Sequence, residues 1–207
     1  MPESTRPANP LLVSTRNAHK VAEIRAILGS DFGVCDLSTI PDMPVVEETG
    51  TTFEENAALK AVAASLHFDG WVIADDSGLE VDALGGAPGV YSARYAGEPS
   101  NDLANNNLLL NNLKSVRGKG RSARFRCIIV LARHGRKLAA FSGAVEGQII
   151  PKPRGSSGFG YDPLFVPDGY CETFAELGDD QKNSLSHRSN ALARLKAWGG
   201  WDPPLES

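Results

Sequence analysis

Two adjacent carboxylates follow a short apolar run near the middle of the chain. Residues 71–74 predict a buried strand, and Asp75, Asp76 and Ser77 are expected in the turn that leaves it. Neighbouring acidic side chains repel each other unless a cation offsets their charge, and ligands bind at the carboxyl ends of strands in α/β sheets. The segment therefore indicates either a metal-dependent site or an ordinary solvated turn.

A second polar group joins an early strand to a helix. Residues 11–13 predict the strand, and the helix is expected to begin after Asn17, a good N-cap, and to end at Gly29. A helix start presents free N–H groups to an anion, and Thr15 and Lys20 add a hydroxyl and a cation. The pattern suits a triphosphate, and it equally describes a capped helix with an exposed lysine.

A second carboxylate pair, Glu47 and Glu48, precedes another predicted helix. Magnesium prefers oxygen ligands and often takes only one or two carboxylates beside phosphates and water, so Glu48 and Asp76 are candidates for one Mg²⁺ site. Lys60, on the helix, is expected either to meet phosphate or to neutralise Asp75. A solvated acidic loop is the alternative to a metal site.

Phe159 stands between two glycines in a predicted loop. Glycines free the backbone and expose the ring, and aromatic faces stack on nucleobases. Asp162 is then expected to accept hydrogen bonds from a base edge or a ribose, although a tight turn with the ring packed inward fits as well. Three further polar residues lie near the C-terminus: Lys182, His187 and Arg188. They are expected either to line a pocket or to belong to an ordinary polar helix face.

The elements that would position these groups alternate strand and helix early in the chain. A helix capped by Thr52 is expected to reach about Leu66, and one capped by Ser100 to reach about Leu113. Strands are predicted over 33–37 and, as a hairpin turning at His134, over 124–132 and 138–147; a final helix starts between 180 and 186 and runs to about residue 198. The mixture indicates an α/β protein with a mixed sheet.

The composition is that of an ordinary globular protein of 207 residues, with 42% hydrophobic residues and a net charge of −4. This charge disfavours nucleic acid and anionic membranes as partners. The three cysteines lack metal-ligand spacing, and neither a signal peptide nor a membrane-spanning run is visible. A cytoplasmic location is expected, with residues 1–10 as a flexible extension.

Taken together, the motifs closely resemble the non-canonical purine nucleoside triphosphate pyrophosphatases, the HAM1-like NTPases. The resemblance implies an α/β fold with an elongated mixed sheet flanked by helices, and two lobes around a central substrate cleft within one domain over residues 11–198. It also implies a homodimer and Mg²⁺ dependence. The implied reaction converts ITP, dITP and XTP to the monophosphate and pyrophosphate, which cleanses the nucleotide pool. The matching segments are 15–20, 47–50, 74–79, 85–95, 158–163 and 186–188.

The resemblance also implies a role for each matching residue. Asp76 is the expected catalytic proton acceptor, and Glu48 and Asp76 are the expected metal ligands. The implied triphosphate contacts are Thr15, Arg16, Asn17, Ala18, His19 and Lys20. The implied contacts to the rest of the nucleotide are Ser77, Phe159, Gly160, Tyr161, Asp162, Lys182, His187 and Arg188. Arg16 and His19 depart from the smaller residues of bacterial relatives, so their phosphate contacts can differ.

Two other functions fit the same residues. One is a different Mg²⁺-dependent NTP or dNTP pyrophosphatase, and the other is a nucleotide-binding module without catalysis. A panel of triphosphates with Mg²⁺ separates these functions when pyrophosphate and orthophosphate are measured separately. Pyrophosphate from ITP or XTP would support the HAM1-like reaction, and orthophosphate would indicate a different phosphohydrolase. Tight binding without turnover would identify the module.

Overall fold

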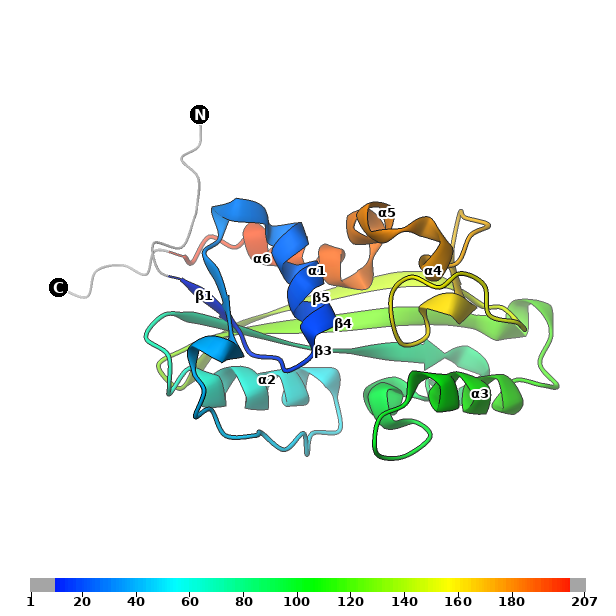
Figure 1. Cartoon of the computed structure of the whole chain (residues 1–207), viewed down its shortest axis with the longest axis horizontal. Helices are drawn as coiled ribbons and strands as arrows, with labels where there is room; N and C mark the ends of the chain where they lie inside the picture. The colour runs from blue at the N-terminus through cyan, green and yellow to red at the C-terminus, as the bar shows by residue number, and fades with distance from the viewer. Residues whose placement is uncertain (1–9, 202–207) are drawn as a thin grey trace. The chain divides into compact units, whose positions relative to one another are not determined.

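Figure 1 shows the computed structural model of the chain, in which residues 10–201 are described. One sheet has the strand order β2-β1-β3-β4-β5-β6. β1 is parallel to both β2 and β3, whereas β5 and β6 are antiparallel, so the sheet is mixed as predicted. The strands are β1 Leu11–Val13, β2 Val34–Asp36, β3 Trp71–Val81, β4 Ser122–Arg133, β5 Arg136–Ile149 and β6 Phe165–Pro167.

Helices connect or follow these strands (Figure 1). Within the described part of the chain they are α1 Ala18–Leu28, α2 Phe53–Ala64, α3 Asp102–Asn112, α4 Phe174–Leu177, α5 Asp179–Leu185 and α6 His187–Lys196. Among residues 10–201, the helices are too short or too polar to cross a membrane. The extension expected at residues 1–10 lies outside the described residues except for its last position.

The chain divides into two compact units. The first unit contains the chain up to Asp76, residues 128–142 and the chain from Ser189 onward; the second contains residues 77–127 and 143–188. The candidate catalytic carboxylate is therefore the last residue of one stretch of the first unit, and Ser77 opens the second.

In the first unit, α1 and α2 cover opposite faces of the parallel strands (Figure 1). Successive side chains of a strand point to opposite faces. Leu12 and Val72 pack with Ala64 of α2 in one core cluster. α1 buries Val21 and Ile24, as its predicted apolar stripe requires. Two connections of the β-α-β type thus set one helix on each side of β1 and β3.

In the second unit, aromatic rings form the centre of the core. Phe125 of β4 meets Phe165 at a centroid distance of 4.8 Å and Phe174 at 5.8 Å. Leu109 of α3 and Leu113, the residue that follows this helix, are both fully buried in the same cluster. The long strands β4 and β5 therefore carry a large apolar surface into this unit.

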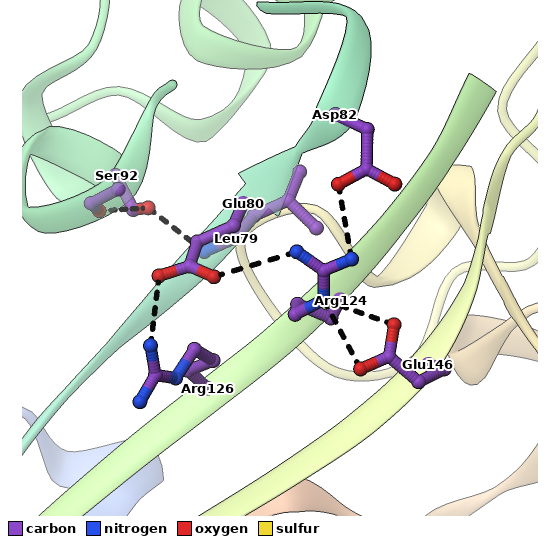
Figure 2. A network of polar contacts seen from close by, with 8 residues as sticks. Leu79, Glu80, Asp82, Ser92, Arg124, Arg126 and Glu146 are labelled. Atoms are coloured by element: carbon purple, nitrogen blue, oxygen red, sulfur yellow. Dashed lines mark hydrogen bonds and ion pairs between the residues drawn. The ribbon is translucent and has the colours of Figure 1, made fainter. Parts of the chain in front are cut away.

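An ion network crosses one face of the second unit (Figure 2). Arg124 Nη2 lies 2.9 Å from Asp82 Oδ1 and its Nε 2.9 Å from Glu146 Oε2, while Arg126 Nη1 lies 3.4 Å from Glu80 Oε1. Glu80, Arg124, Arg126 and Glu146 come from β3, β4 and β5, and Asp82 directly follows β3. The alternation of side chains along the strands lets these residues share a face. Each positive charge in this network faces at least one carboxylate.

Several predicted boundaries were wrong for local reasons. Asn101, not Ser100, caps α3, since Ser100 Oγ donates to the Ala93 carbonyl whereas the Asn101 side chain accepts the Ala104 N–H at 2.9 Å. The predicted final helix is two helices, α5 and α6, because Ser186 between them is extended (φ −68°, ψ 159°). The hairpin at His134 was predicted correctly, whereas α4 and β6 were not predicted.

Candidate active site

Asp75 and Asp76 lie inside β3 rather than in a turn after it. The predicted turn was wrong because both carboxylates have partners that hold them in an extended segment. As neighbours in a strand they point to opposite faces of the sheet. Asp76 shares the face of Val72, which packs against α2, and Asp75 therefore faces α1.

Asp75 pairs with Lys20 of α1. Lys20 Nζ lies 2.9 Å from Asp75 Oδ2, and the carboxylate side chain is 0% exposed. Neutralising Asp75 was one of the two roles expected for Lys60, and the structure shows Lys20 in direct contact with this carboxylate. The single lysine of the predicted phosphate segment thus already holds a buried carboxylate.

Asp76 is held from the α2 side. Lys60 Nζ lies 3.1 Å from Glu48 Oε1 and 3.7 Å from Asp76 Oδ1. The Asn56 side chain donates to Asp76 Oδ2 at 3.2 Å and accepts the Gly50 N–H at 2.8 Å. Glu48 and Asp76, far apart in sequence, are thereby brought around one ammonium group, as a shared metal site requires.

Asn56 was missed from the sequence. It is fully buried in α2, and it joins the loop that carries Glu48 to the carboxylate of Asp76. A Cβ atom at Gly50 would lie 2.7 Å from Asn56 Oδ1, so the loop can approach only because that residue is glycine. Asparagine favours caps and turns over helix interiors. An asparagine inside a predicted helix was therefore the feature of the sequence that could have drawn attention to this residue.

The pKa values of this cluster respond to burial and to charge in opposite ways. Burial raises the pKa of Asp76 above its ordinary value, and the charges of Lys60 and Lys20 only partly offset the increase. Burial acts to lower the pKa of Lys60, but Asp76, Asp75 and Glu48 outweigh it and the net shift is upward. The ammonium group stays charged, whereas Asp76 is biased toward accepting a proton.

The segment before α1 forms a cap, as predicted. The Asn17 side chain accepts the N–H groups of His19 at 3.0 Å and Lys20 at 3.2 Å, and Thr15 Oγ1 accepts the Asn17 N–H at 3.2 Å. Arg16 Nη2 donates to the Met43 carbonyl at 2.8 Å. The side chains of Thr15, Arg16 and Asn17 therefore shape the loop, while residues 16–19, including Ala18, are exposed.

A second cluster, in the other unit, surrounds Phe159. Lys182 Nζ lies 2.6 Å from Asp162 Oδ2, and both side chains are only 4% exposed. Asp162 Oδ2 also accepts the Phe159 N–H at 2.9 Å, and Lys182 Nζ lies 4.8 Å from the centre of the Phe159 ring. Asp162 thus holds the Phe159 backbone and the Lys182 ammonium group, and its expected contact with a base edge or a ribose stays a prediction.

Gly160 and Tyr161, the next residues of this loop, form hydrogen bonds with Asp102 of α3 and with Ser92. The Gly160 N–H donates to Asp102 Oδ2 at 2.7 Å, and the buried Tyr161 hydroxyl donates to the Ser92 carbonyl at 2.8 Å. Gly158 has φ +76°, and a Cβ atom there would lie 2.1 Å from Asp162 Oδ2. Hydrogen bonds and a close glycine contact therefore fix the conformation of this loop.

His187 and Arg188 are both buried in the second unit. The His187 ring stacks on Phe125 with centroids 4.9 Å apart and planes 13° apart. Arg188 Nη2 donates to Ser77 Oγ at 3.0 Å. The structure thus brings Ser77 and Arg188 together, which their separation in sequence did not reveal.

The donor set around Asp76 fits a small divalent cation. Residues 10–201 contain no group of three or more acidic, histidine or cysteine side chains placed to bind a metal. Mg²⁺ does not need such a cage, because it commonly takes one or two carboxylates with water and phosphate. Glu48 and Asp76 supply two carboxylates that already converge on a positive charge.

Comparisons with known proteins agree with this geometry. The model of the Ham1 family matches residues 11–198. A protein of Geobacter sulfurreducens named dITP/XTP pyrophosphatase is 53% identical over 192 residues, covering 92% of this chain and 96% of the relative. One of Oceanobacillus iheyensis with the same name is 48% identical over 190 residues, covering 91% and 96%.

Solved structures show the same fold. The Ham1 protein of Coxiella burnetii aligns with a TM-score of 0.82 at 37% identity, covering 91% of this chain and 97% of its own. The Staphylococcus aureus Ham1 protein aligns with a TM-score of 0.80 at 43% identity, covering 91% and 96%. Sequence and fold lead to one assignment: this chain belongs to the Ham1 family.

Proposed function

We propose that this chain hydrolyses ITP, dITP and XTP to the monophosphate and pyrophosphate, and so removes them before they enter DNA or RNA. Relatives that are about half identical over nine-tenths of the chain are named dITP/XTP pyrophosphatase. The observation that carries the proposal in this molecule is the convergence of Glu48, Lys60 and Asn56 on the buried Asp76. A nucleotide-binding module would not need that arrangement.

In the proposed reaction, water attacks the α-phosphorus and pyrophosphate leaves. Asp76 accepts the proton of the water; the higher pKa of a buried carboxyl group favours a base that works near neutral pH. Asn56 holds the Asp76 carboxylate at one oxygen, so that the other stays directed toward Lys60. Phosphoryl transfer depends mainly on such positioning and on charge stabilisation.

Nucleotide pyrophosphatases generally need a divalent metal ion, and we infer that Mg²⁺ is bound by Glu48 and Asp76. The bound ion would neutralise phosphate charge. The exposed residues 16–19 stand at the positive end of the α1 dipole, which suits the pyrophosphate end of the substrate. Lys20 supports this end while it holds Asp75.

The second unit supplies the contacts proposed for the base and sugar. The Phe159 ring is half-buried and held by its loop, so one face can stack on a purine. Donors from Arg188 or His187 would favour a 6-oxo group over a 6-amino group, because a mismatched base leaves buried groups unpaired. We expect a much lower kcat/KM for ATP than for ITP.

The reaction is tested by following an isotope. The protein is incubated with Mg²⁺ and ITP, XTP, dUTP or ATP in water enriched in ¹⁸O, and the products are analysed by mass spectrometry. Attack at the α-phosphorus places ¹⁸O in the monophosphate and none in pyrophosphate. Label in pyrophosphate, release of orthophosphate, or equal turnover of ATP and ITP would contradict the proposal.

Three broader expectations remain proposals. We propose a homodimer, which light scattering on the purified protein would measure as twice the mass of the 22.1 kDa chain. We also propose one domain over residues 11–198, which would unfold in a single transition. A cytoplasmic location would appear as activity in the cytosolic fraction of the source cells.

A further inference from the structure

A hollow with a volume of about 630 Å³ lies within the second unit. Its wall combines the C-terminal part of α3, the turn at Gly118–Arg121 and the end of β5. The residues that line it include none of those assigned above to substrate or metal. Sites for small molecules commonly have volumes of about 300–1,000 Å³, so the hollow is large enough for one.

Three cations line this hollow: Lys114, Arg117 and Arg121. Arg121 Nε donates to the Ile149 carbonyl at 2.6 Å and its Nη1 to the Leu113 carbonyl at 2.9 Å. Arg117 Nη1 donates to the carbonyl oxygen of Lys114 at 2.5 Å. Within residues 10–201, these three side chains form no ion pair with a carboxylate.

The Arg124 network contrasts with these three cations, because its arginines pair with carboxylates. Arg124 and Arg126 lie a few residues further along the same segment and face Glu80, Asp82 and Glu146 (Figure 2). No acidic residue occurs in the chain between Asp102 and Glu146, so carboxylates must come from other segments. They reach β4 but not the hollow, whose lining contains no acidic residue.

Arg121 is the fixed part of this positive wall. Its side chain is buried, with the residue 7% exposed, and its backbone partners satisfy N–H groups without cancelling the charge. Burial, followed by the charge of Arg117, lowers the pKa of Arg121. An anion entering the hollow would offset a cost that the folded chain now carries.

The charge and the lining together indicate the class of anion. Three cations match a group with two negative charges better than a single carboxylate, and guanidinium groups bind phosphate through paired N–H donors. The remaining wall is largely apolar, with Leu110, Val116 and Ile149, so it suits an apolar body rather than a bare ion. We propose that this hollow binds an organic phosphate monoester, with its phosphate at Lys114 and Arg117 and its apolar part on this wall.

The test is a titration with phenyl phosphate, followed by ¹H–¹⁵N NMR of the full chain without added metal. Saturable shifts are expected for the amides of residues 114–121 and 148–151, with inorganic phosphate binding more weakly. The double variant Lys114→Gln/Arg117→Gln should bind about tenfold more weakly, as expected for the loss of charge-assisted hydrogen bonds. Arg121 is left intact because its carbonyl contacts support the fold.

A charge-matched control separates this site from general attraction. Lys119→Gln/Arg136→Gln removes the same charge from exposed positions that do not line the hollow, and it should change the affinity less than twofold. Hydrolysis of ITP should be unchanged in both double variants. The proposal would be overturned if the shifts did not saturate or were confined to residues 15–20. It would also be overturned if the control variant bound equally weakly, or if hydrolysis were lost together with binding.

Discussion

The acidic cluster of the first unit and the Phe159 cluster of the second unit balance their charges differently. In the first unit, three carboxylates (Glu48, Asp75 and Asp76) share two ammonium groups, those of Lys20 and Lys60. In the second unit, one carboxylate meets one ammonium group at 2.6 Å, and both side chains are 4% exposed. The first cluster is therefore rich in carboxylates around partly accessible ammonium groups, whereas the second is built on an ion pair whose two side chains are almost fully buried.

This difference separates chemistry from scaffolding. A cluster rich in carboxylates is suited to a metal ion and to proton transfer. A closed ion pair is suited to hold a recognition loop in one shape. Substitutions should therefore affect turnover in the first cluster and stability in the second, and the following experiments test that division.

Asp76→Asn should have the largest effect. It keeps the size of the side chain and removes both the base and a metal-ligand charge, so kcat for ITP should fall about 10²–10⁴-fold. Pyrophosphate release with Mg²⁺ measures it, and the exposed Asp69→Asn is the matched control. Near-normal turnover by Asp76→Asn would remove this residue from the mechanism.

Lys182→Met should act on stability instead. Removing one partner of a buried ion pair destabilises a protein by about 3–5 kcal/mol. Unfolding in urea gives this free energy, and Lys182→Met/Asp162→Leu should regain part of it because both charged groups of the pair are then replaced by apolar ones. If the double variant is no more stable than Lys182→Met, the pair is not the stabilising element.

Asn56→Leu should have an intermediate effect that links both properties. It removes the hydrogen-bond acceptor of the Gly50 N–H, which should lower the free energy of unfolding by about 1–3 kcal/mol. It also removes the hydrogen bond that holds the Asp76 carboxylate. We expect kcat to fall by about tenfold with a smaller change in KM, as for a positioning residue. Asn111→Leu, at an exposed position of α3, should change neither, and an unchanged kcat in Asn56→Leu would argue against positioning.

The smallest effect should be a pH dependence of stability in the metal-free protein. Because burial raises the pKa of Asp76 in the folded state, the folded protein binds more protons than the unfolded chain at pH values between the two pKa values. The free energy of unfolding should therefore decrease as pH rises through that window. Urea unfolding with a chelator measures this decrease, which should be absent in Asp76→Asn and present in Asp69→Asn.

The sequence predicted those features that depend on local residues. The cap at Asn17, the helix opened by Thr52 and the hairpin at His134 depend on short-range contacts, and all three are observed. The end of β3 was predicted too early because hydrophobicity falls at Asp75. What keeps the strand extended there is a set of partners on two helices, which no local pattern reports.

The site was predictable by type but not by partner. The family motifs identified Asp76, Phe159 and Lys182. They did not predict that Lys182 forms an ion pair with Asp162. Asn56 was overlooked because its neighbours in the sequence are ordinary helix residues. Its importance comes from two contacts, with Gly50 and Asp76, that exist only after folding.

The alternation of β3 also limits how this protein can change. Asp75 and Asp76 are the same amino acid, and only their order along the strand assigns one to Lys20 and the other to Asn56 and Lys60. Inserting or deleting one residue upstream in β3 would exchange the two assignments without altering a single side chain. Substitutions in this segment can be gradual, but changes in its length cannot, so its spacing should be the least variable property of the strand among functional variants.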